Sequence, residues 1–300
     1  MELGVTTETD RLGAGTAQQA VTEHILGLAD RSGYAAALID GVEGTVTTWL
    51  QFARTVRAAA RGLSRRGLQR GDTVGVFVQD AASHAVAVHA VRAAGGVAAP
   101  VRAPGVPAEP AVQAEPAVQA CWAAEDIAVQ LKECRARLLI TSAPLAEVAI
   151  QAAERSLVRQ VFAFGEAAET TPFASLLDVA KHAQPGVGGP NGSIGTALGY
   201  IPGQIPDFSR PRPSEEHGLG LTGRDLGLTR RDVVVAGPPC GEGNAYTARL
   251  DMALAAGATI VAAPLAQVTD AVQAYRGTAA IVPGGTHVPG VPAGRVFTVG

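Results

Sequence analysis

The chain has 300 residues, of which 47% are hydrophobic and 17% charged, with 24 basic and 27 acidic side chains and a net charge of −3. This length and composition suit one large globular domain or two packed subdomains, each with its own core. The charge balance excludes the basic surface that binds nucleic acid, and no apolar segment has the character of a secretory signal or a membrane span. We therefore expect a cytoplasmic, unanchored protein without a nucleic-acid or membrane partner.

Cysteine and lysine usage limits the chemistry further. Cys121, Cys134 and Cys240 are odd in number and lack a C-x-x-C spacing, which is typical of reduced thiols and argues against a disulfide framework or a zinc site. Only two basic residues are lysines, Lys132 and Lys181.

The six histidines form no set with the spacing of metal ligands. His84 and His89 are five residues apart on an expected helix and therefore point to different faces. We expect no bound metal, and histidines that are either exposed or satisfied by hydrogen bonds.

Short apolar runs alternate with helical periodicity from Tyr34 to about Leu177, which predicts βαβ units and a mostly parallel sheet. Thr48 can cap a helix on which apolar residues recur at the 3.6-residue period. The expected strands lie at 35–39, 45–47, 72–78, 97–100, 137–141 and 160–164, and the expected helices at 50–63, 83–94, 125–134 and 143–155.

Two segments interrupt this pattern. In residues 101–123 the hexapeptide Glu-Pro-Ala-Val-Gln-Ala occurs twice in succession, at 109–114 and 115–120, which predicts an inserted surface loop or linker, with a docking peptide as the alternative. Residues 184–218 are rich in proline and glycine and predict a long loop or a partly disordered segment.

Periodicity returns in the last third of the chain. We expect three units: a first α/β subdomain at 1–183 that contains the insertion, the loop at 184–218, and a partial second α/β subdomain at 219–300. The expected strands of the last unit lie at 232–236, 258–261, 279–282 and 295–299, and its helices at 244–255 and 265–275.

Several segments form a recognisable series. They are Thr48-Trp-Leu-Gln-Phe-Ala-Arg54, residues 62–76, Ala94-Gly-Gly-Val-Ala-Ala-Pro100, residues 124–141, residues 228–239 and residues 254–264. The series resembles the N-terminal part of the adenylate-forming superfamily, which includes acyl-CoA ligases such as 4-coumarate-CoA ligase, peptide-synthetase adenylation domains and luciferases. The resemblance implies an α/β fold of mostly parallel sheets flanked by helices, without the C-terminal lid domain of these enzymes.

The resemblance also shows what the chain lacks. Enzymes of this superfamily hold triphosphate with a Ser/Thr/Gly-rich loop and lysine, whereas residues 184–218 have no Gly-Thr-Thr-Gly motif and no lysine. The remnant of the next motif is Leu221-Thr-Gly-Arg-Asp225, so the resemblance implies Thr222, Arg224 and Asp225 as cofactor-binding candidates. We expect no cofactor, ATP and Mg²⁺ included, and no ATP-dependent acyl ligation by this chain alone.

Cys240 is the candidate catalytic residue. It follows an expected strand and precedes an expected helix, at the sheet edge where α/β proteins bind ligands, and a helix N-terminus makes a thiol more reactive. The alternative is that Cys240 is a small apolar residue that only fills space in the fold. The anion Glu242 lies two residues away in the sequence and no histidine is adjacent, which favours this alternative.

Three hypotheses of function remain. The first is a degenerate adenylate-forming homologue in secondary metabolism that acts as a helper or binding protein. Its target would be an acyl or aryl group, a carrier protein or a full-length ligase. Association with copies of itself, as a homo-oligomer, is the alternative to a protein partner. The second is an enzyme for an acyl or aryl substrate, either a residual acyl-CoA or AMP ligase or a recruited pocket that uses Cys240. The third is a truncated product, poorly soluble because its last strand lacks cover.

Overall fold

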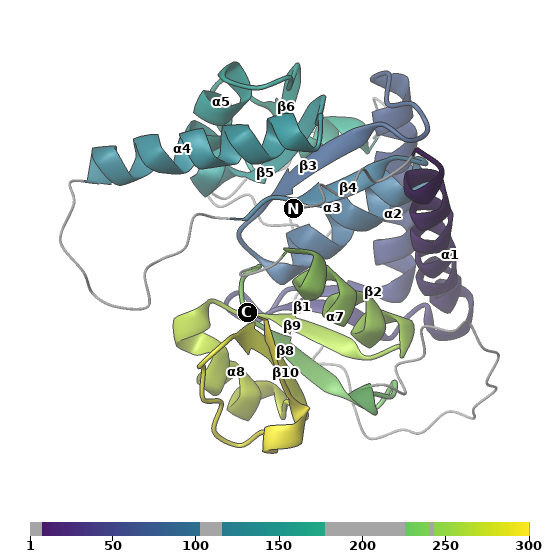
Figure 1. Ribbon diagram of the computed structural model, residues 1–300. Helices are drawn as coiled ribbons and strands as arrows, with labels where there is room; N and C mark the ends of the chain where they lie inside the picture. Colours follow the sequence, from purple (N-terminus) through teal and green to yellow (C-terminus); the bar gives the residue numbers. More distant parts are fainter. Residues whose placement is uncertain (1–7, 103–115, 178–225, 240–242, 300) are drawn as a thin grey trace, which may run out of the picture.

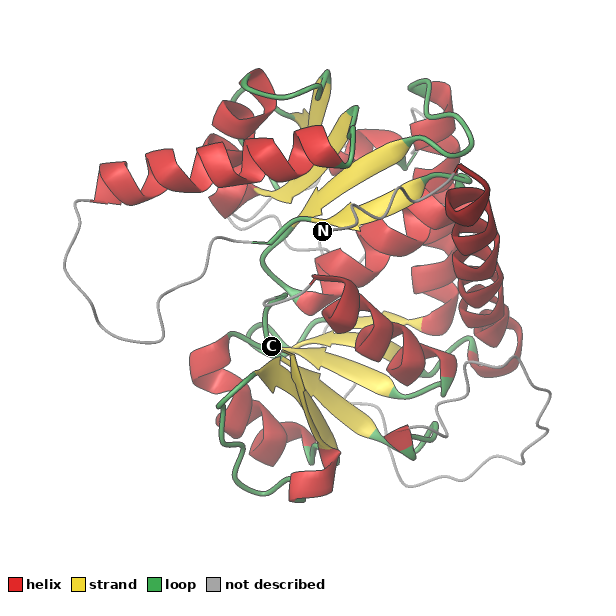
Figure 2. Ribbon diagram, in the orientation of Figure 1, coloured by secondary structure: helices red, strands yellow, loops and turns green. Residues whose placement is uncertain are grey.

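The computed structural model describes residues 8–102, 116–177, 226–239 and 243–299. The described elements form five layers, in which two β-sheets alternate with three layers of helices (Figure 1). The fold is therefore mixed α/β, with mostly parallel sheets flanked by helices, as the sequence predicts. Figure 2 shows the two sheets separated by helices.

The lower sheet has the strand order β11-β10-β8-β9-β1-β2. Its neighbouring strands are parallel except in the hairpin of β1 and β2. Its strands are β1 (Ala36–Asp40), β2 (Val46–Thr48), β8 (Val233–Ala236), β9 (Thr259–Ala262), β10 (Ala279–Pro283) and β11 (Val296–Val299).

The upper sheet has the order β4-β3-β5-β6-β7 and is parallel throughout. Its strands are β3 (Thr73–Phe77), β4 (Val97–Pro100), β5 (Leu138–Ser142), β6 (Gln160–Phe164) and β7 (Thr171–Pro172).

Helices cover both sheets on both faces (Figure 1). The middle layer holds α1 (Glu8–Ser32), α2 (Trp49–Arg65), α3 (Ala81–Ala93) and α7 (Gly243–Ala255), the top layer α4 (Pro116–Glu133) and α5 (Ala146–Glu154), and the bottom layer α8 (Val268–Tyr275). The short 3₁₀ turns are η1 (Ala143–Leu145), η2 (Phe173–Leu176), η4 (Leu265–Gln267) and η5 (Ala293–Arg295).

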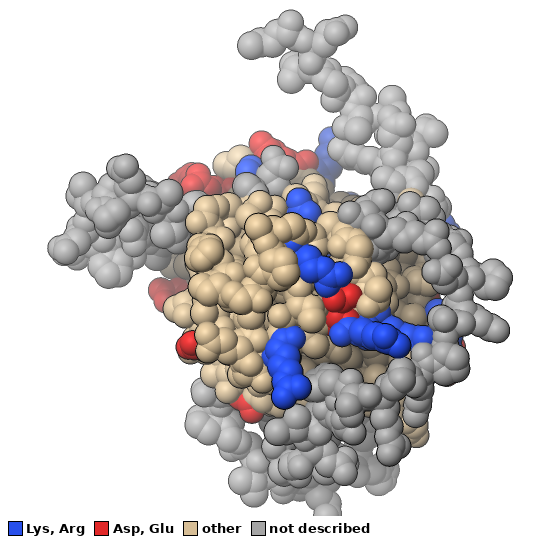
Figure 3. All heavy atoms as spheres, turned by 90° about the horizontal axis from the view of Figure 1, so that it is seen from below, with Lys and Arg blue, Asp and Glu red and all other residues tan. Residues whose placement is uncertain are grey.

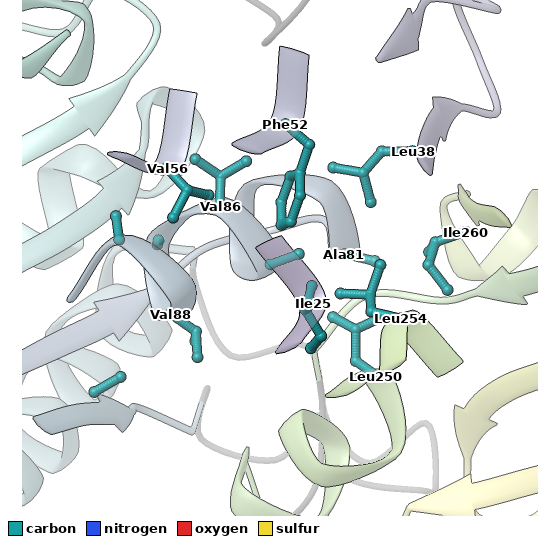
Figure 4. Packing of buried hydrophobic residues seen from close by; sticks show 14 of the residues in the cluster. Ile25, Leu38, Phe52, Val56, Ala81, Val86, Val88, Leu250, Leu254 and Ile260 are labelled. Atoms are coloured by element: carbon teal, nitrogen blue, oxygen red, sulfur yellow. The ribbon is translucent and has the colours of Figure 1, made fainter. Parts of the chain in front are cut away.

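The core follows the layers. The largest apolar cluster fills the space between the sheets and joins Ile25 of α1, Phe52 of α2 and Leu254 of α7 (Figure 4). Two smaller clusters lie under α8 and under α4 and α5. Strands buried on both faces read as continuous apolar runs, which explains why they could be found in the sequence.

The second hexapeptide differs from its expected structure. Residues 101–123 are not loop throughout, because α4 begins at Pro116 and takes in most of the second copy, while the first copy lies outside the described residues. Proline is accepted at the first position of a helix, where its missing N–H would have no partner.

The two sheets also do not divide at residue 183. Strands β1 and β2 belong to the first expected unit but pair in the same sheet as β8 to β11. The boundary of the two units stays a prediction, and the expected loop at 184–218 lies outside the described residues. None of the described helices is both long enough and apolar enough to cross a membrane.

Candidate functional site

The site residues predicted from the sequence lie outside the part of the chain that the structure describes. This holds for Cys240 and for Thr222, Arg224 and Asp225. The elements around Cys240 are as expected, because β8 ends at Ala236 and α7 begins three residues after the cysteine.

Cys134 is the cysteine whose side chain the structure describes. It is half-buried at the end of α4, and its thiol donates to the carbonyl of Leu131 at 3.5 Å. Burial raises the pKa of this thiol. Cys134 is therefore a poor nucleophile at neutral pH.

The carboxyl ends of strands from both sheets meet at the N-terminus of α7. An added Cβ on Gly243, the first residue of α7, would lie 2.6 Å from the Cβ of Pro100 at the end of β4. Asp80, which follows β3, is near enough to Asp40, at the end of β1, for the two charges to interact. We call this region the junction. The carboxyl ends of parallel strands are where α/β folds bind ligands.

Asp40 and Asp80 serve the local backbone. Asp40 Oδ1 accepts the N–H of Val42 at 2.8 Å and of Glu43 at 2.9 Å, which fixes the turn of the β1–β2 hairpin. Asp80 Oδ1 accepts the N–H of Ser83 at 2.7 Å and caps α3. Burial raises the pKa of Asp80, and the charge of Asp40 adds to this effect.

The described residues of the junction include two carboxylates, Asp40 and Asp80, and no lysine. The described lysine, Lys132, is exposed in the last turn of α4, close to the chain segment that enters β5. It therefore lies at the amino edge of the upper sheet, whereas the junction lies at the carboxyl edge.

A network of buried polar side chains connects the helices α1, α3 and α7 of the middle layer. His84 of α3 is 1% exposed, and its Nε2 lies 2.8 Å from Oγ1 of Thr247 on α7. Thr247 donates to the carbonyl of Gly243 at 2.7 Å, while Tyr246 donates to the carbonyl of Gly237 at 2.7 Å. These bonds fix the first turn of α7 against β8 and α3.

The second half of the network contains the buried charges. Arg92 of α3 donates to Oδ2 of Asp251 on α7 at 2.6 Å, and His89 Nε2 lies 3.5 Å from Oδ1 of the same carboxylate. His89 Nδ1 lies 3.0 Å from Oγ1 of Thr22 on α1. Burial raises the pKa of Asp251, and Arg92 opposes this shift.

Both histidines of the network are neutral at pH 7. Burial lowers the pKa of His84 to about 3, and Arg92 contributes to the shift. Burial likewise lowers the pKa of His89 well below its usual value, with Arg92 and His84 as further causes. Both rings reach α7, His84 through Thr247 and His89 through Asp251, while His89 also contacts Thr22 of α1. No group of described residues has the composition of a metal site.

Comparison with known proteins settles the family. The family model for the AMP-binding enzyme matches residues 28–198, more than half of the chain. The chain belongs to the AMP-binding enzyme family. The search of curated proteins found no match to the chain.

Several solved structures share its fold. A long-chain-fatty-acid-CoA ligase from Archaeoglobus fulgidus has a TM-score of 0.59 at 15% identity, with 88% of this chain and 51% of the ligase aligned. A protein from Rhodopseudomonas palustris described as a putative long-chain-fatty-acid CoA ligase has a TM-score of 0.58 at 16% identity, covering 91% and 63%. The N-terminal domain of FACL13 from Mycobacterium tuberculosis has a TM-score of 0.57 at 16% identity, covering 88% and 63%.

The chain therefore spans about half to 63% of the length of these structures. At this level of identity the likeness shows the fold alone. The candidate residues Thr222, Arg224, Asp225 and Cys240 stay predictions.

Proposed function

We propose that this AMP-binding family member is a helper or binding protein that does not activate acyl groups with ATP on its own. Its target is an acyl or aryl group, a carrier protein or a full-length ligase, in secondary metabolism. The proposal rests on a family scaffold in which the segment expected to bind phosphate, residues 184–218, contains no lysine.

The observation that carries the proposal is the chemistry of the junction. Asp40 and Asp80 place carboxylates at the ends of β1 and β3, and Lys132 lies at the opposite edge of the upper sheet. Lys181, the other lysine, precedes the segment that the resemblance assigns to phosphate binding. Loss of one donor from a preorganised charge-stabilising site typically costs about 3 kcal/mol of transition-state stabilisation.

The junction is better suited to an apolar ligand. Pro100 ends β4, and Pro238 and Pro239 follow β8, where both are partly exposed. Such side chains can contact the tail of an acyl group or the ring of an aryl group without hydrogen bonds of their own.

An ATP–pyrophosphate exchange assay tests the loss of catalysis. The purified chain is incubated with a panel of aryl and fatty acids, with an intact acyl-CoA ligase as positive control. We expect no exchange above the background of a heat-inactivated sample. Robust exchange with any acid of the panel would overturn the proposal.

Binding of a fluorescent fatty acid tests the retained function. We expect saturable binding that Pro238→Glu weakens, because a carboxylate would enter the apolar part of the junction. Pro289→Glu, an exposed position after β10, is the matched control. If the wild type shows no saturable binding, or if both variants lose affinity equally, the acyl group is excluded as a target. A carrier protein and a full-length ligase would then remain as the proposed targets.

A second candidate, an enzyme that uses Cys240, is favoured by one feature. The helix that begins three residues after this cysteine is well anchored, since Tyr246 donates to the carbonyl of Gly237 and Thr247 contacts His84 of α3. A fixed helix N-terminus stabilises a thiolate. Titration with a mild alkylating agent, with Cys240→Ser as reference, decides: a Cys240 no more reactive than free cysteine at neutral pH eliminates this candidate.

A further inference from the structure

The amino edge of the upper sheet, opposite the junction, carries neighbouring arginines. Arg137 and Arg159 lead into β5 and β6, and the N–H of Arg159 donates to the carbonyl of Arg137 at 2.8 Å. Because Leu138 pairs with Gln160 in parallel register, the two arginines lie side by side on adjoining strands. Both of them are exposed.

The alternation of side chains along the strands places both arginines on the face that α4 and α5 cover. Leu139 and Val161, two residues further along the same strands, belong to the apolar cluster under these helices. The ends of α4 and α5 lie at the same edge, because each helix leads into the strand that follows it, and they add three exposed basic side chains. The basic edge, as we call this surface, consists of Lys132, Arg135, Arg137, Arg155 and Arg159.

Acidic groups compensate only part of this charge. Glu133 and Glu154, at the ends of the same helices, are exposed. The two helix C-termini together contribute about one further negative charge, so the cations of the basic edge remain in excess by about two charges. Within the described chain, none of these cations forms an ion pair.

Other acidic residues do not reach the basic edge. Asp72, which precedes β3, lies on the opposite face of the sheet with Val74, and its carboxylate accepts the N–H of Gln69 at 2.9 Å. On the face of the molecule seen from below, by contrast, acidic atoms lie among the basic ones (Figure 3). The basic edge is thus a concentration of positive charge on a chain whose net charge is −3, and it suits an anionic partner.

Arg135 occupies a backbone conformation that suits glycine better. Its φ is 55°, in the left-handed region, which glycine adopts without strain and most other residues do not. After α2, α3 and α7 the corresponding position is taken by Gly67, Gly95 and Gly257. A strained residue of this kind indicates a use for the side chain beyond the turn itself.

An exposed leucine lies within the basic edge. Leu157 is 54% exposed in the turn between α5 and β6, two residues from each of the flanking arginines. The turn is fixed, because the hydroxyl of Ser156 donates to the carbonyl of Ala153 at 3.0 Å and accepts the N–H of Val158 at 3.3 Å. A side chain on a fixed turn loses little conformational entropy when a partner covers it.

The combination of an apolar anchor and a charged rim is typical of a protein interface. An anionic membrane matches less well, because stable attachment needs more buried apolar surface than one leucine offers. A nucleic acid also matches less well, since none of the side chains that form the basic edge is an aromatic ring on which a base could stack. We propose that the basic edge docks the acidic surface of a protein partner, with Leu157 in an apolar recess of that surface.

The basic edge and the junction can be occupied at the same time. Strands β5 and β6 are each five residues long, so about 17 Å of sheet separates their two ends. The inference therefore goes beyond the acyl-binding function proposed above and stands or falls independently of it.

Fluorescence anisotropy with two acidic peptides tests the inference. The probe is a fluorescein-labelled peptide in which glutamates flank two leucines, and the reference peptide has serines in place of the leucines. We expect the wild type to bind the probe more tightly than the reference. Arg137→Glu/Arg159→Glu should weaken binding of the probe by at least about tenfold, and Leu157→Ser should remove the difference between the two peptides. Arg137→Ala/Arg159→Ala, shown by circular dichroism to be folded, should also weaken binding.

Matched variants separate the site from the net charge. Arg231→Glu/Arg276→Glu makes the same change in charge at exposed positions that lead into β8 and β10 of the lower sheet, and it should leave binding within about twofold. Val42→Ser, at a valine that is 60% exposed in the turn between β1 and β2, is the control for Leu157→Ser and should keep the preference for the probe.

Four outcomes would overturn the inference. They are equal binding of the two peptides by the wild type, equal loss in Arg231→Glu/Arg276→Glu, and tighter binding of phosphatidylserine vesicles or of single-stranded DNA than of the probe. A dimer in analytical ultracentrifugation that Arg137→Glu/Arg159→Glu dissociates would likewise overturn it, because a second copy of the chain would then cover the basic edge.

Discussion

Arg92 carries a positive charge into the interior of the middle layer, where it is 6% exposed and Asp251, at 15%, is its acidic partner. Replacing the carboxylate with an amide would leave that charge buried and uncompensated. We expect Asp251→Asn to lower the free energy of unfolding by about 3 kcal/mol in urea titrations. Glu154→Gln, at an exposed position at the end of α5, should change it by less than about 0.5 kcal/mol.

A double variant distinguishes loss of the pair from loss of packing. Arg92→Met/Asp251→Leu removes both charges and keeps apolar volume, so it should recover most of the stability that Asp251→Asn loses. If the double variant is less stable than Asp251→Asn, the role of the pair is packing rather than charge compensation.

The two buried histidines make stability depend on pH. In the unfolded chain each has a pKa near its usual 6.5, whereas in the folded chain burial lowers the pKa of His84 to about 3 and that of His89 well below its usual value. Below pH 6.5 the unfolded chain therefore binds protons that the folded chain does not. The free energy of unfolding should fall by about 1.4 kcal/mol for each pH unit and each histidine, while above pH 6.5 this contribution is complete.

The variant His84→Gln should show a shallower loss of stability between about pH 6 and pH 5, by about half of the histidine contribution. The raised pKa values of Asp80 and Asp251 have the opposite effect, since they increase the free energy of unfolding as the pH falls. They do so in the wild type and in His84→Gln alike, so the difference between the two slopes reports on His84. His287→Gln, at an exposed position, is the control and should keep the wild-type slope. Equal slopes for all three proteins would show that His84 is charged in the folded state.

This network could not be predicted as a unit from the sequence. His84 and Thr247 are 163 positions apart, and Arg92 and Asp251 are 159 apart, so no local spacing signals either contact. The helical periodicity placed these residues on helices, but only the packing of α7 on α3 brings them together. Cys240 is predicted from its position between an expected strand and an expected helix, and the phosphate segment from a motif resemblance, and both lie outside the described structure.

Among the elements, α2 shows most directly how close packing selects a residue. At Gly62, in its second half, an added Cβ would meet the carbonyl oxygen of Leu176 in η2 and lie 2.7 Å from the Cα of that residue. Both atoms belong to the backbone and cannot rotate away. Overpacking of this kind costs about 1–3 kcal/mol, against a gain of about 1 kcal/mol in helix propensity from alanine.

We therefore expect Gly62→Ala to lower the free energy of unfolding by about 1 kcal/mol, and by no more than about 2 kcal/mol, measured by urea titration. Gly27 of α1 is the matched control, because nothing lies within 4 Å of an added Cβ there. Gly27→Ala should be neutral or stabilise by up to about 1 kcal/mol. A stabilised Gly62→Ala would show that η2 moves away from α2 at little cost.

The strands were the elements that sequence periodicity predicted best, because each is a short apolar run between turn residues. The capping box of Thr48 and Gln51 at the start of α2 agrees with the expected cap. Helix α1 was not predicted: its sequence is rich in glycine, alanine and threonine and lacks a strong apolar stripe, so it is held by packing against α2 and α3. The start of α4 differs from the sequence prediction because proline and tandem repeats are typical of loops, whereas here Pro116 opens the helix.

At the scale of the whole molecule, the two sheets and their shared middle layer form one packed unit. The largest apolar cluster contains residues of both sheets, and α3 and α7 contact both of them. A ligand bound at the junction would touch ends of strands from both sheets, so its binding energy would add to the stability of the whole described fold.

Thermal shift with nucleotide is therefore a test at this scale. A ligand at one hundred times its dissociation constant adds about 2.7 kcal/mol and raises Tm by a few degrees. Because the described junction presents carboxylates and the phosphate segment has no lysine, we expect no measurable shift with millimolar Mg-ATP, and a positive shift with a hydrophobic acyl or aryl compound. A clear shift with ATP that Arg210→Ala/Arg212→Ala abolishes would show that arginines have replaced the missing lysine, and would make ATP-dependent ligation the leading function.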